Sequence, residues 1–302
     1  MRLFEDEIAD LLGRNGIGFT AETFPAYTML SATKTAYGSV PAGTVRIILI
    51  PLKAFSIEEA MEQSMAAGTL SGYPDTISIA EDRWMRNREM MAGRLLAHLG
   101  IFRSIYARDC EIKKISRTEA DSFLERTHSY GGAKCRYCYG IFLKREREKD
   151  FGLHNADGRL LSGCLIAVAE FSNARRWIKD GRSVRSYEWI RYASLPDVRI
   201  NGGMGKILNR FIGDIGPDDI MSYADLEWSD GQAYRRLGFS ADGKKSPVTF
   251  AVVPGSWQRI PVNSPKQEHI PSGSDTAANG QEASSIRYFR NFGSLKYRLR
   301  LY

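Results

Sequence analysis

A glycine-rich turn is the part of the sequence whose residue types point most directly to chemistry. Gly202-Gly203-Met204-Gly205 is followed by Lys206 and then by apolar residues at helical spacing. A helix N-terminus presents unpaired backbone N–H groups and the positive end of the helix dipole, so it is suited to bind phosphate. Glycines allow the backbone to approach such a ligand closely, and a lysine adds positive charge. We therefore predict that Gly202, Gly203, Met204, Gly205 and Lys206 bind a phosphate-bearing cofactor.

Three charged side chains in the flanking segments could complete a transferase site. Glu188 and Arg191 lie in an alternating segment before the glycine turn, and Asp225 ends an apolar segment after it. Either carboxylate could accept a proton from an amine nucleophile. Arg191 could hold a phosphate or a carboxylate through two parallel hydrogen bonds. The alternative is a structural ion pair between Arg191 and one of the two carboxylates.

The order of elements in residues 109–260 carries a family resemblance. The pattern is a strand, a helix, several antiparallel strands, the glycine turn opening a helix, a strand, a short helix and a strand. The short helix contains Tyr234 and leads into Leu237-Gly238-Phe239. This arrangement resembles the GNAT class of acyltransferases, which implies acetyl-CoA or a related acyl-CoA as the small-molecule donor and Tyr234 as a proton donor to the leaving thiolate. Ile200 departs from the class, which has Arg or Gln at that place, and a packing role for Tyr234 is the alternative.

A narrower resemblance joins three segments of the same domain. They are Tyr187-Glu188-Trp189-Ile190-Arg191-Tyr192, the glycine turn, and Ser222-Tyr223-Ala224-Asp225 with Ser229, Gly231 and Tyr234. Together they look similar to phage-encoded GNAT-like proteins, including the Mom type that modifies DNA adenine. The resemblance implies catalytic roles for Glu188, Arg191, Asp225 and Tyr234, with Tyr223 and Ser229 binding substrate.

His128 is a further candidate for substrate binding. It lies in Thr127-His128-Ser129-Tyr130-Gly131-Gly132, after the first helix of the domain. The GNAT resemblance implies that this loop faces the acceptor substrate. The alternative is a surface histidine with no ligand.

The elements that must position these residues can be predicted from hydrophobic periodicity and capping signals. Ser116 and Glu119 have the spacing of a capping box, so a helix is expected to begin there. Apolar runs predict strands at residues 138–143, 163–171, 187–193, 220–224 and 249–253. The predicted fold class is α/β (α+β): a GNAT-like mixed sheet with flanking helices, preceded by a smaller α/β domain.

That smaller domain, residues 1–108, resembles a second family. We expect a helix at residues 4–13, a strand at 45–52, a helix capped by Ser56, a strand at 76–79 and a long helix from Glu81. These features look like the Vsr-like PD-(D/E)XK nucleases, which bind a metal through carboxylates. Ile50-Pro51-Leu52-Lys53 stands where the acidic residues belong, and only Glu7 resembles a retained acid. The resemblance thus implies a degenerate nuclease domain, and a plain α/β domain is the alternative.

Charge and composition narrow the choice of partners. The chain has 302 residues and a net charge of +7, which favours an anionic partner such as DNA, RNA or a phosphorylated cofactor. Residues 261–284 are polar and predict a flexible linker, whereas residues 285–302 are basic and aromatic and predict one or two strands. Those strands form either a nucleic-acid contact or an edge hairpin with solvated arginines.

Cysteine usage and the N-terminal residues bear on the compartment. Four cysteines do not make a disulfide framework, and Cys135 and Cys138 form a single CxxC without a second pair at zinc spacing. We expect ordinary reduced cysteines and no metal, and a metal or redox role for the CxxC pair is the alternative. No apolar run approaches the roughly 20 residues of a membrane span, and Met1 to Glu7 lack signal-peptide character. These observations predict a cytoplasmic protein without membrane contact.

Two main functional hypotheses follow from the sequence, and a third, an active nuclease, would be excluded by the absence of metal-dependent cleavage. The first is a GNAT-like N-acyltransferase of phage or mobile-element character that acts on nucleic acid or another amine. The second is a non-catalytic nucleic-acid-binding protein in which two enzyme folds have degenerated. Affinity for CoA distinguishes them, and the sequence does not fix the oligomeric state.

Overall fold

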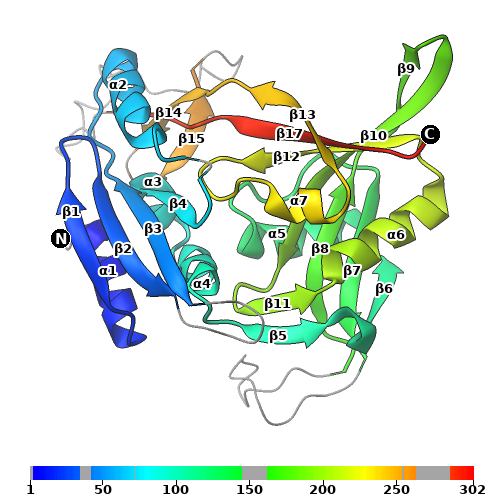
Figure 1. Ribbon diagram of the computed structural model, residues 1–302, viewed down its shortest axis with the longest axis horizontal. Helices are drawn as coiled ribbons and strands as arrows, with labels where there is room; N and C mark the ends of the chain where they lie inside the picture. The colour runs from blue at the N-terminus through cyan, green and yellow to red at the C-terminus, as the bar shows by residue number, and fades with distance from the viewer. Residues whose placement is uncertain (1–2, 35–41, 72, 145–161, 254, 263–285) are drawn as a thin grey trace, which may run out of the picture. The chain divides into compact units, whose positions relative to one another are not determined.

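The computed structural model describes residues 3–34, 42–71, 73–144, 162–253, 255–262 and 286–302 (Figure 1). They divide into two compact units, each built from three stretches of chain. Unit 1 comprises Met1–Ala92, Ala224–Asp230 and Lys244–Leu295; unit 2 comprises Gly93–Tyr223, Gly231–Gly243 and Lys296–Tyr302. The division predicted from sequence is contiguous, with boundaries near residues 108 and 260, so it differs from these interleaved units. Residues 263–284 of the predicted linker lie outside the described residues.

The main sheet of unit 2 has eight strands in the order β13-β17-β12-β10-β8-β7-β6, with β9 paired to β10 (Figure 1). The strands are β6 (Cys110–Lys114), β7 (Tyr137–Leu143), β8 (Leu165–Phe171), β9 (Arg175–Lys179), β10 (Arg182–Ser194), β12 (Asp219–Asp225), β13 (Ser240–Lys245) and β17 (Ser294–Arg300). The β6-β7-β8-β10 part is antiparallel, whereas β10 and β12 are parallel. The predicted mixed sheet is confirmed.

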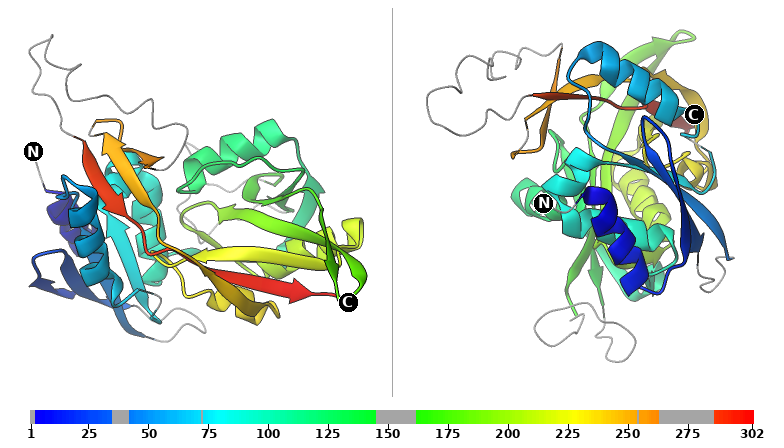
Figure 2. Two further views of the ribbon diagram at one scale, coloured as in Figure 1. Left: turned by 90° about the horizontal axis from the view of Figure 1, so that it is seen from above. Right: turned by 90° about the vertical axis from the view of Figure 1, so that its left-hand side faces the viewer.

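Helices α5 (Arg117–Thr127) and α6 (Gly203–Ile215) cover opposite faces of this sheet (Figure 2). Phe123 of α5 is buried in a cluster with Cys138 and Val168. Phe211 of α6 stacks on Phe171 with ring centroids 3.9 Å apart, on the other face. The helix–sheet–helix layering follows from strand alternation, since neighbouring residues of β7 and β8 point to different helices.

Strand β10 contains a bulge at the point where it leaves its parallel neighbour. Trp189 pairs with Phe171 and Arg191 with Glu170 on β8, so Ile190 is the extra residue. The pairing of β10 with β12 runs only from Ser186 to Glu188. Beyond the bulge the two strands are therefore no longer paired with each other, which opens the sheet at their C-terminal ends.

Short elements surround the start of α6. Strands β5 (Arg103–Tyr106) and β11 (Val198–Asn201) form a two-stranded parallel sheet, and the 3₁₀ turn η1 (Ala107–Asp109) follows β5. Helix α7 (Gln232–Arg236) lies between β12 and β13 in the chain. Strand β11 leads directly into the glycine turn, so this small sheet fixes the entry to α6.

Unit 1 contains two sheets. The four-stranded sheet has the order β1-β2-β3-β4, from β1 (Phe19–Thr23), β2 (Thr28–Lys34), β3 (Gly43–Ile50) and β4 (Thr76–Ala80), with β4 parallel to β3. The three-stranded sheet has the order β15-β14-β16, from β15 (Gln258–Pro261), β14 (Thr249–Val253) and β16 (Arg287–Arg290). A buried cluster joins them around Ile48, Ala67 and Phe250.

The helices of unit 1 test the capping predictions. Helices α1 (Phe4–Arg14) and α2 (Ile57–Gly68) occur where expected, and Ser56 Oγ accepts the Glu59 N–H at 3.1 Å. The predicted long helix from Glu81 is wrong, because it is divided into α3 (Glu81–Arg86) and α4 (Arg88–His98). Asn87 separates them and its Oδ1 accepts the Met90 N–H at 3.1 Å, so the asparagine caps a new helix. None of the helices in the described ranges is long and apolar enough to cross a membrane.

Unit 1 also buries a charged triad. Arg259 donates from Nε and Nη2 to both carboxylate oxygens of Asp82, at 2.6 and 3.0 Å. Its Nη1 donates to Glu227 at 3.1 Å, and its guanidinium lies 4.0 Å from the ring centroid of Phe289. All three charged side chains are at most 5% exposed. Burial is the largest influence on the pKa of Glu227 and raises it, although Arg259 acts in the opposite direction.

Candidate functional site

The glycine turn opens α6 with a backbone that side chains would obstruct. Gly202 has a left-handed φ of 77° and its carbonyl accepts the Lys206 N–H at 2.9 Å. The N–H groups of Gly203, Met204 and Gly205 precede that bond, and the first N–H groups of a helix lack partners within it. A methyl group at Gly203 would lie 2.8 Å from Ile200 Cγ2, so no side chain fits there. The turn has the features of an anion site at a helix N-terminus.

Lys206 contributes differently from the prediction that it adds charge for a ligand. Its ammonium donates to the carbonyls of Ala107 and Cys110, at 2.7 and 2.6 Å. The side chain therefore fixes η1 and the start of β6 against α6. The ammonium already has these two protein partners, and nothing tests its predicted contact with a cofactor, so that contact remains a prediction.

The glycine turn lies between the part of β10 beyond the bulge and the end of α7. A methyl group at Gly203 would lie 3.0 Å from the Tyr192 hydroxyl, and one at Gly205 would lie 3.4 Å from Leu237. The Leu237 N–H in turn donates to the Tyr234 carbonyl at 3.0 Å. These contacts bring the predicted cofactor turn and the predicted proton donor into one neighbourhood.

Tyr234 belongs to an aromatic and hydroxyl cluster. Its hydroxyl lies 2.8 Å from Ser222 Oγ, which also donates to the Trp189 carbonyl at 2.8 Å. A serine has one hydroxyl proton, so with that proton on Trp189 the Tyr234 hydroxyl donates to Ser222. The Tyr234 ring stacks on Tyr297 at 5.5 Å. Burial raises the pKa of Tyr234, which the Ser222 hydrogen bond opposes, so the phenol stays protonated at neutral pH.

Arg191 and His128 meet through the loop after α5. Arg191 donates to the Gly131 carbonyl at 3.1 Å and to the Ile190 carbonyl at 3.0 Å, and its guanidinium lies 5.6 Å from the Tyr130 ring centroid. His128 Nδ1 accepts the Tyr130 N–H at 3.2 Å. Arg191 therefore holds both the bulge in β10 and the loop predicted to face the acceptor.

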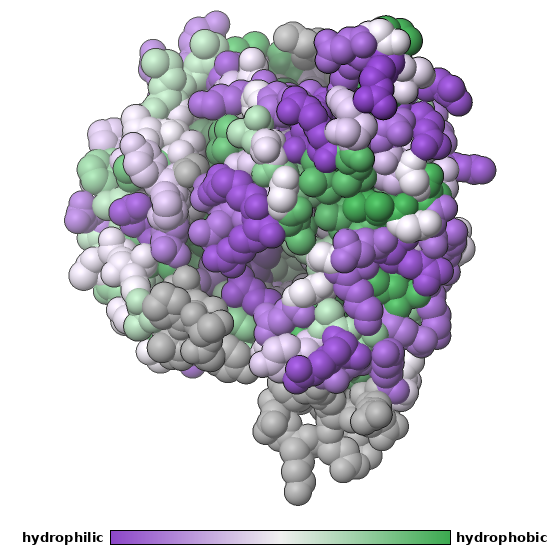
Figure 3. Space-filling model, turned by 45° about the vertical axis from the view of Figure 1, so that its right-hand side comes forward, coloured by the Kyte–Doolittle hydropathy of each residue, from purple (hydrophilic) through white to green (hydrophobic). Residues whose placement is uncertain are grey.

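Glu188 and Tyr223 share a cavity of about 350 Å³ beside the β9–β10 hairpin. Its basic side chains are Arg175, Lys179, Lys296 and Arg298, and its aromatic side chains are Trp177, Tyr187 and Tyr223. Trp177 is 51% exposed on β9, and the hairpin projects past the neighbouring strands in Figure 1. Polar and charged side chains cover much of the face drawn in Figure 3, where they surround an apolar area.

A buried carboxylate organises the basic side chains of this cavity. Asp219 accepts from Lys179 and from Arg298, both at 2.7 Å, and from the hydroxyl of Ser186. Burial raises the pKa of Asp219, but the hydrogen bonds from Lys179 and Ser186 and the charge of Arg298 outweigh burial and lower it. Asp219 thus remains ionised and fixes two cations at the wall of the cavity.

Asp225 and Ser229, the remaining predicted residues, belong to unit 1. Asp225 Oδ1 accepts the Glu227 N–H at 3.0 Å, and the Asp225 carbonyl accepts the Ser229 N–H at 2.9 Å. Both residues therefore shape the turn that ends β12. The catalytic roles of Glu188, Arg191 and Asp225, and the alternative of a structural ion pair between Arg191 and one of these carboxylates, stay predictions.

Comparison with known proteins adds little to this geometry. No protein family model and no curated protein matches the chain. Among solved structures, the chain is similar to Eis1 from Mycobacterium abscessus (17% identity, 47% of this chain, TM-score 0.33), where the match spans only 34% of the Eis1 chain. It is also similar to a chain of the KacTA–DNA complex, with 13% identity over 60% of this chain and 92% of that chain and a TM-score of 0.27. A mutant AtaT toxin bound to the C-terminus of the antitoxin AtaR and acetyl-CoA matches at 11% identity over 60% of this chain and 93% of that chain, with a TM-score of 0.28.

Two features of the site were not anticipated from sequence. Ser222 links Tyr234 to Trp189, and the β9 strand carries Trp177 and Arg175 to the cavity. Asp180-Gly181, between β9 and β10, is a typical two-residue hairpin signal that could have predicted this strand pair. A serine inside an apolar strand gives no comparable signal.

Proposed function

We propose that unit 2 is a GNAT-like N-acyltransferase that uses an acyl-CoA donor. The supporting observation is that the glycine turn lies close to Leu237 at the end of α7, the helix that contains Tyr234. Both lie beside the part of β10 that has separated from β12. A phosphate-bearing donor at Gly203 to Gly205 would use the free N–H groups of α6. Its acyl end could then reach the opening between the strands. Tyr234 lies beside Ser222 of β12, whereas Glu188 is the last residue of β10 that pairs with β12 and faces the cavity beside β9.

The chain's own residues support acid–base chemistry for this transfer. An amine must lose a proton as it attacks the thioester carbonyl, and the departing thiolate must gain one. Glu188 borders the cavity, so it is our candidate to receive the amine proton. Tyr234 keeps its proton at neutral pH and is our candidate to give it to the thiolate.

For the acceptor, we propose an amine on a nucleic acid. The cavity beside Glu188 combines cations with the exposed indole of Trp177. Bases stack on exposed aromatic rings while basic side chains follow the phosphates. The resemblance to Mom-type proteins agrees with a nucleobase amine and with a phage or mobile-element setting.

For unit 1, we propose a nuclease-type fold retained for docking to nucleic acid or to a protein partner. The order α1, β1, β2, β3, α2, β4 contains the succession on which the Vsr-like resemblance rests. Glu7, the only acid that resembled a nuclease ligand, accepts from Trp84 Nε1 and Arg88 Nε, each at 2.7 Å. These partners give Glu7 a structural role between α1 and the α3–α4 region.

Acetyl-CoA should stabilise the purified protein against heat. A ligand at about 100 times its dissociation constant adds roughly 2.7 kcal/mol, which is a shift of several degrees in Tm. Gly205→Glu should abolish this shift in Tm, because the introduced carboxylate repels phosphate. The variant should still fold, since an acidic residue in the first turn of a helix interacts favourably with the helix dipole. The measurement is differential scanning fluorimetry with acetyl-CoA, CoA and acetyl-pantetheine, which lacks the phosphates.

Gly213→Glu is the matched control, since Gly213 lies on the same helix with open space around it. That variant should keep the acetyl-CoA shift, and acetyl-pantetheine should give none with any protein. If wild-type protein shows no shift with millimolar acetyl-CoA or CoA, the acyltransferase proposal fails. The non-catalytic nucleic-acid-binding protein then becomes the better explanation.

Trp177→Ala should weaken binding of a single-stranded DNA oligonucleotide by about tenfold. Base–aromatic stacking contributes about 1–3 kcal/mol per base, and tenfold corresponds to about 1.4 kcal/mol. Fluorescence anisotropy at fixed salt measures the change. Ile178→Ala is the control, because Ile178 is 75% exposed on the same strand but offers no ring. Equal affinities for wild type and both variants would exclude this surface as the nucleic-acid contact.

A further inference from the structure

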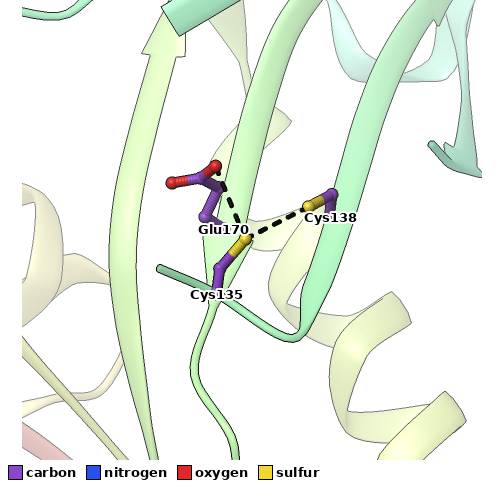
Figure 4. Close-up of side chains that lie close together, drawn as sticks. All are labelled: Cys135, Cys138 and Glu170. Carbon is purple, nitrogen blue, oxygen red and sulfur yellow. Dashed lines mark hydrogen bonds between the residues drawn. The ribbon is translucent and has the colours of Figure 1, made fainter. Parts of the chain in front are cut away.

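A row of three ionisable side chains crosses the sheet of unit 2. Cys138 on β7 lies opposite Glu170 on β8, and Glu170 lies opposite Arg191 on β10. Cys135 enters the row from the loop before β7. Its Sγ is 3.3 Å from Cys138 Sγ and 3.5 Å from Glu170 Oε1 (Figure 4). At the β7 side of this row, the two thiol sulfurs and a carboxylate oxygen of Glu170 therefore lie close together.

The convergence is built into rigid parts of the fold. The ligand atoms of Cys135, Cys138 and Glu170 all lie within 4.8 Å of one another, and within the described ranges no other such group of His, Cys, Asp or Glu occurs. Glu170 is fully buried, and its second oxygen accepts the Ala133 N–H at 3.0 Å. Two of the three side chains project from paired strands, so their spacing is fixed by the sheet.

The loop that carries Cys135 is also held closely. A methyl group at Gly132 would lie 2.1 Å from Asp121 Oδ1 and 3.2 Å from Asp121 Cα, so the loop packs closely against α5. Arg191 holds the same loop through the Gly131 carbonyl. Cys135 therefore has little freedom to move away from Cys138 and Glu170.

Two of the three distances between the ligand atoms are closer to those of a tetrahedral metal site than to a disulfide, and the third, between Cys138 and Glu170, is at most 4.8 Å. Zinc–sulfur bonds of about 2.3 Å and a zinc–oxygen bond of about 2.0 Å place sulfur and oxygen about 3.5 Å apart and two sulfurs about 3.8 Å apart. The structure has 3.5 Å for Cys135 to Glu170 and 3.3 Å between the sulfurs. A disulfide requires about 2.05 Å, and CxxC is a common spacing of zinc ligands.

We propose that Cys135, Cys138 and Glu170 bind one Zn²⁺ ion. Two Zn–S bonds form as the two thiol protons leave to solvent, and the carboxylate supplies the third ligand. Two thiolates and a carboxylate exceed the charge of the ion by one negative charge, which the neighbouring Arg191 offsets. Cys135 is partly exposed, so the fourth position is open to water or to a ligand. The expectation of ordinary cysteines without a metal missed Glu170, which lies 32 residues beyond Cys138 inside an apolar strand.

The test is a Co²⁺ titration of the full-length protein, purified with reductant and stripped of metal. One equivalent of Co²⁺ should produce thiolate-to-cobalt charge-transfer absorption and the visible bands of tetrahedral cobalt. One equivalent of Zn²⁺ should remove both. Metal analysis of protein loaded with Zn²⁺ and then desalted should give one ion per chain.

Single substitutions assign the ligands. Cys135→Ser and Cys138→Ser should each lower Co²⁺ affinity at least about 100-fold, and Glu170→Gln, which keeps the shape of the side chain, about tenfold or more. Cys164→Ser is the matched control, because Cys164 is a free cysteine outside the cluster, and it should bind Co²⁺ as wild type does. Circular dichroism shows that each variant is folded. If reduced wild-type protein takes up no more Co²⁺ than Cys135→Ser, the metal site is overturned, whether or not the two cysteines oxidise to a disulfide in air.

Discussion

Replacing Arg259 with methionine should lower the free energy of unfolding by about 3–5 kcal/mol at neutral pH, because two buried carboxylates lose their shared guanidinium. Asp82 loses two hydrogen bonds and Glu227 loses one. Methionine fills a similar volume against Phe289, so the cost is electrostatic rather than a cavity. Urea unfolding followed by tryptophan fluorescence measures the change.

The loss should depend on pH in a definite direction. Burial raises the pKa of Glu227 and Arg259 opposes that rise, so without Arg259 the folded state should hold the Glu227 pKa still further above its unfolded value. A carboxyl whose pKa is raised by folding contributes most to the free energy of unfolding below its unfolded pKa. That contribution is lost as the pH rises through the folded-state pKa. The difference between Arg259→Met and wild type should therefore shrink from pH 7.5 to pH 5.

Arg290→Met is the matched control for this prediction. Arg290 lies on β16 of the same sheet and donates to the neutral hydroxyl of Thr249 at 3.0 Å. Its loss should be about 1 kcal/mol and nearly independent of pH. A loss for Arg259→Met that equals this control, or that grows on acidification, would contradict the electrostatic account of the triad.

Tyr234→Phe should lower kcat for acyl transfer by about 10²- to 10⁴-fold with little change in the KM for acetyl-CoA, if Tyr234 protonates the departing thiolate. Phenylalanine keeps the ring that stacks on Tyr297, so donor binding should persist. Thiol release from acetyl-CoA gives the rate, with an adenine-rich oligonucleotide and a panel of primary amines as acceptors. Since burial raises the pKa of Tyr234, the alkaline decline of the wild-type rate should lie above the ordinary phenol value of 10.

Tyr297→Phe supplies the control for the tyrosine prediction. It makes the same chemical change on the stacked partner, whose hydroxyl accepts from Arg235 at 2.7 Å. That variant should keep kcat, although it should unfold at a lower temperature. If both variants retain the wild-type rate, Tyr234 is a packing residue, which is the alternative that the sequence left open.

Local signals in the sequence predicted much of the fold. The capping boxes at Ser56 and Ser116 mark the starts of α2 and α5, and each serine accepts the N–H that the motif requires. The glycine turn opens α6 as expected. These predictions succeed because the hydrogen bonds involved span only three residues, so a short window contains all the information.

Non-local pairing explains most of what the sequence could not show. Strand β17 lies between β13 and β12 in the main sheet, and Arg298 reaches Asp219, which is 79 residues away. No local pattern identifies a partner at that distance. Glu170 was missed for a related reason, since a single carboxylate in an apolar strand acquires meaning only when Cys138 lies opposite it.

The position of β17 also constrains how the chain is made in the cell. A ribosome releases residues in order, so β12 and β10 emerge long before residues 294–300 can fill the place between β12 and β13. Until then β12 has an unpaired edge, and such edges favour association with other nascent chains. Unit 1 likewise awaits its stretch Lys244–Leu295. Neither unit can be finished during synthesis of the first 243 residues, so a nonsense mutation before residue 294 would remove β17 from the interior of the main sheet.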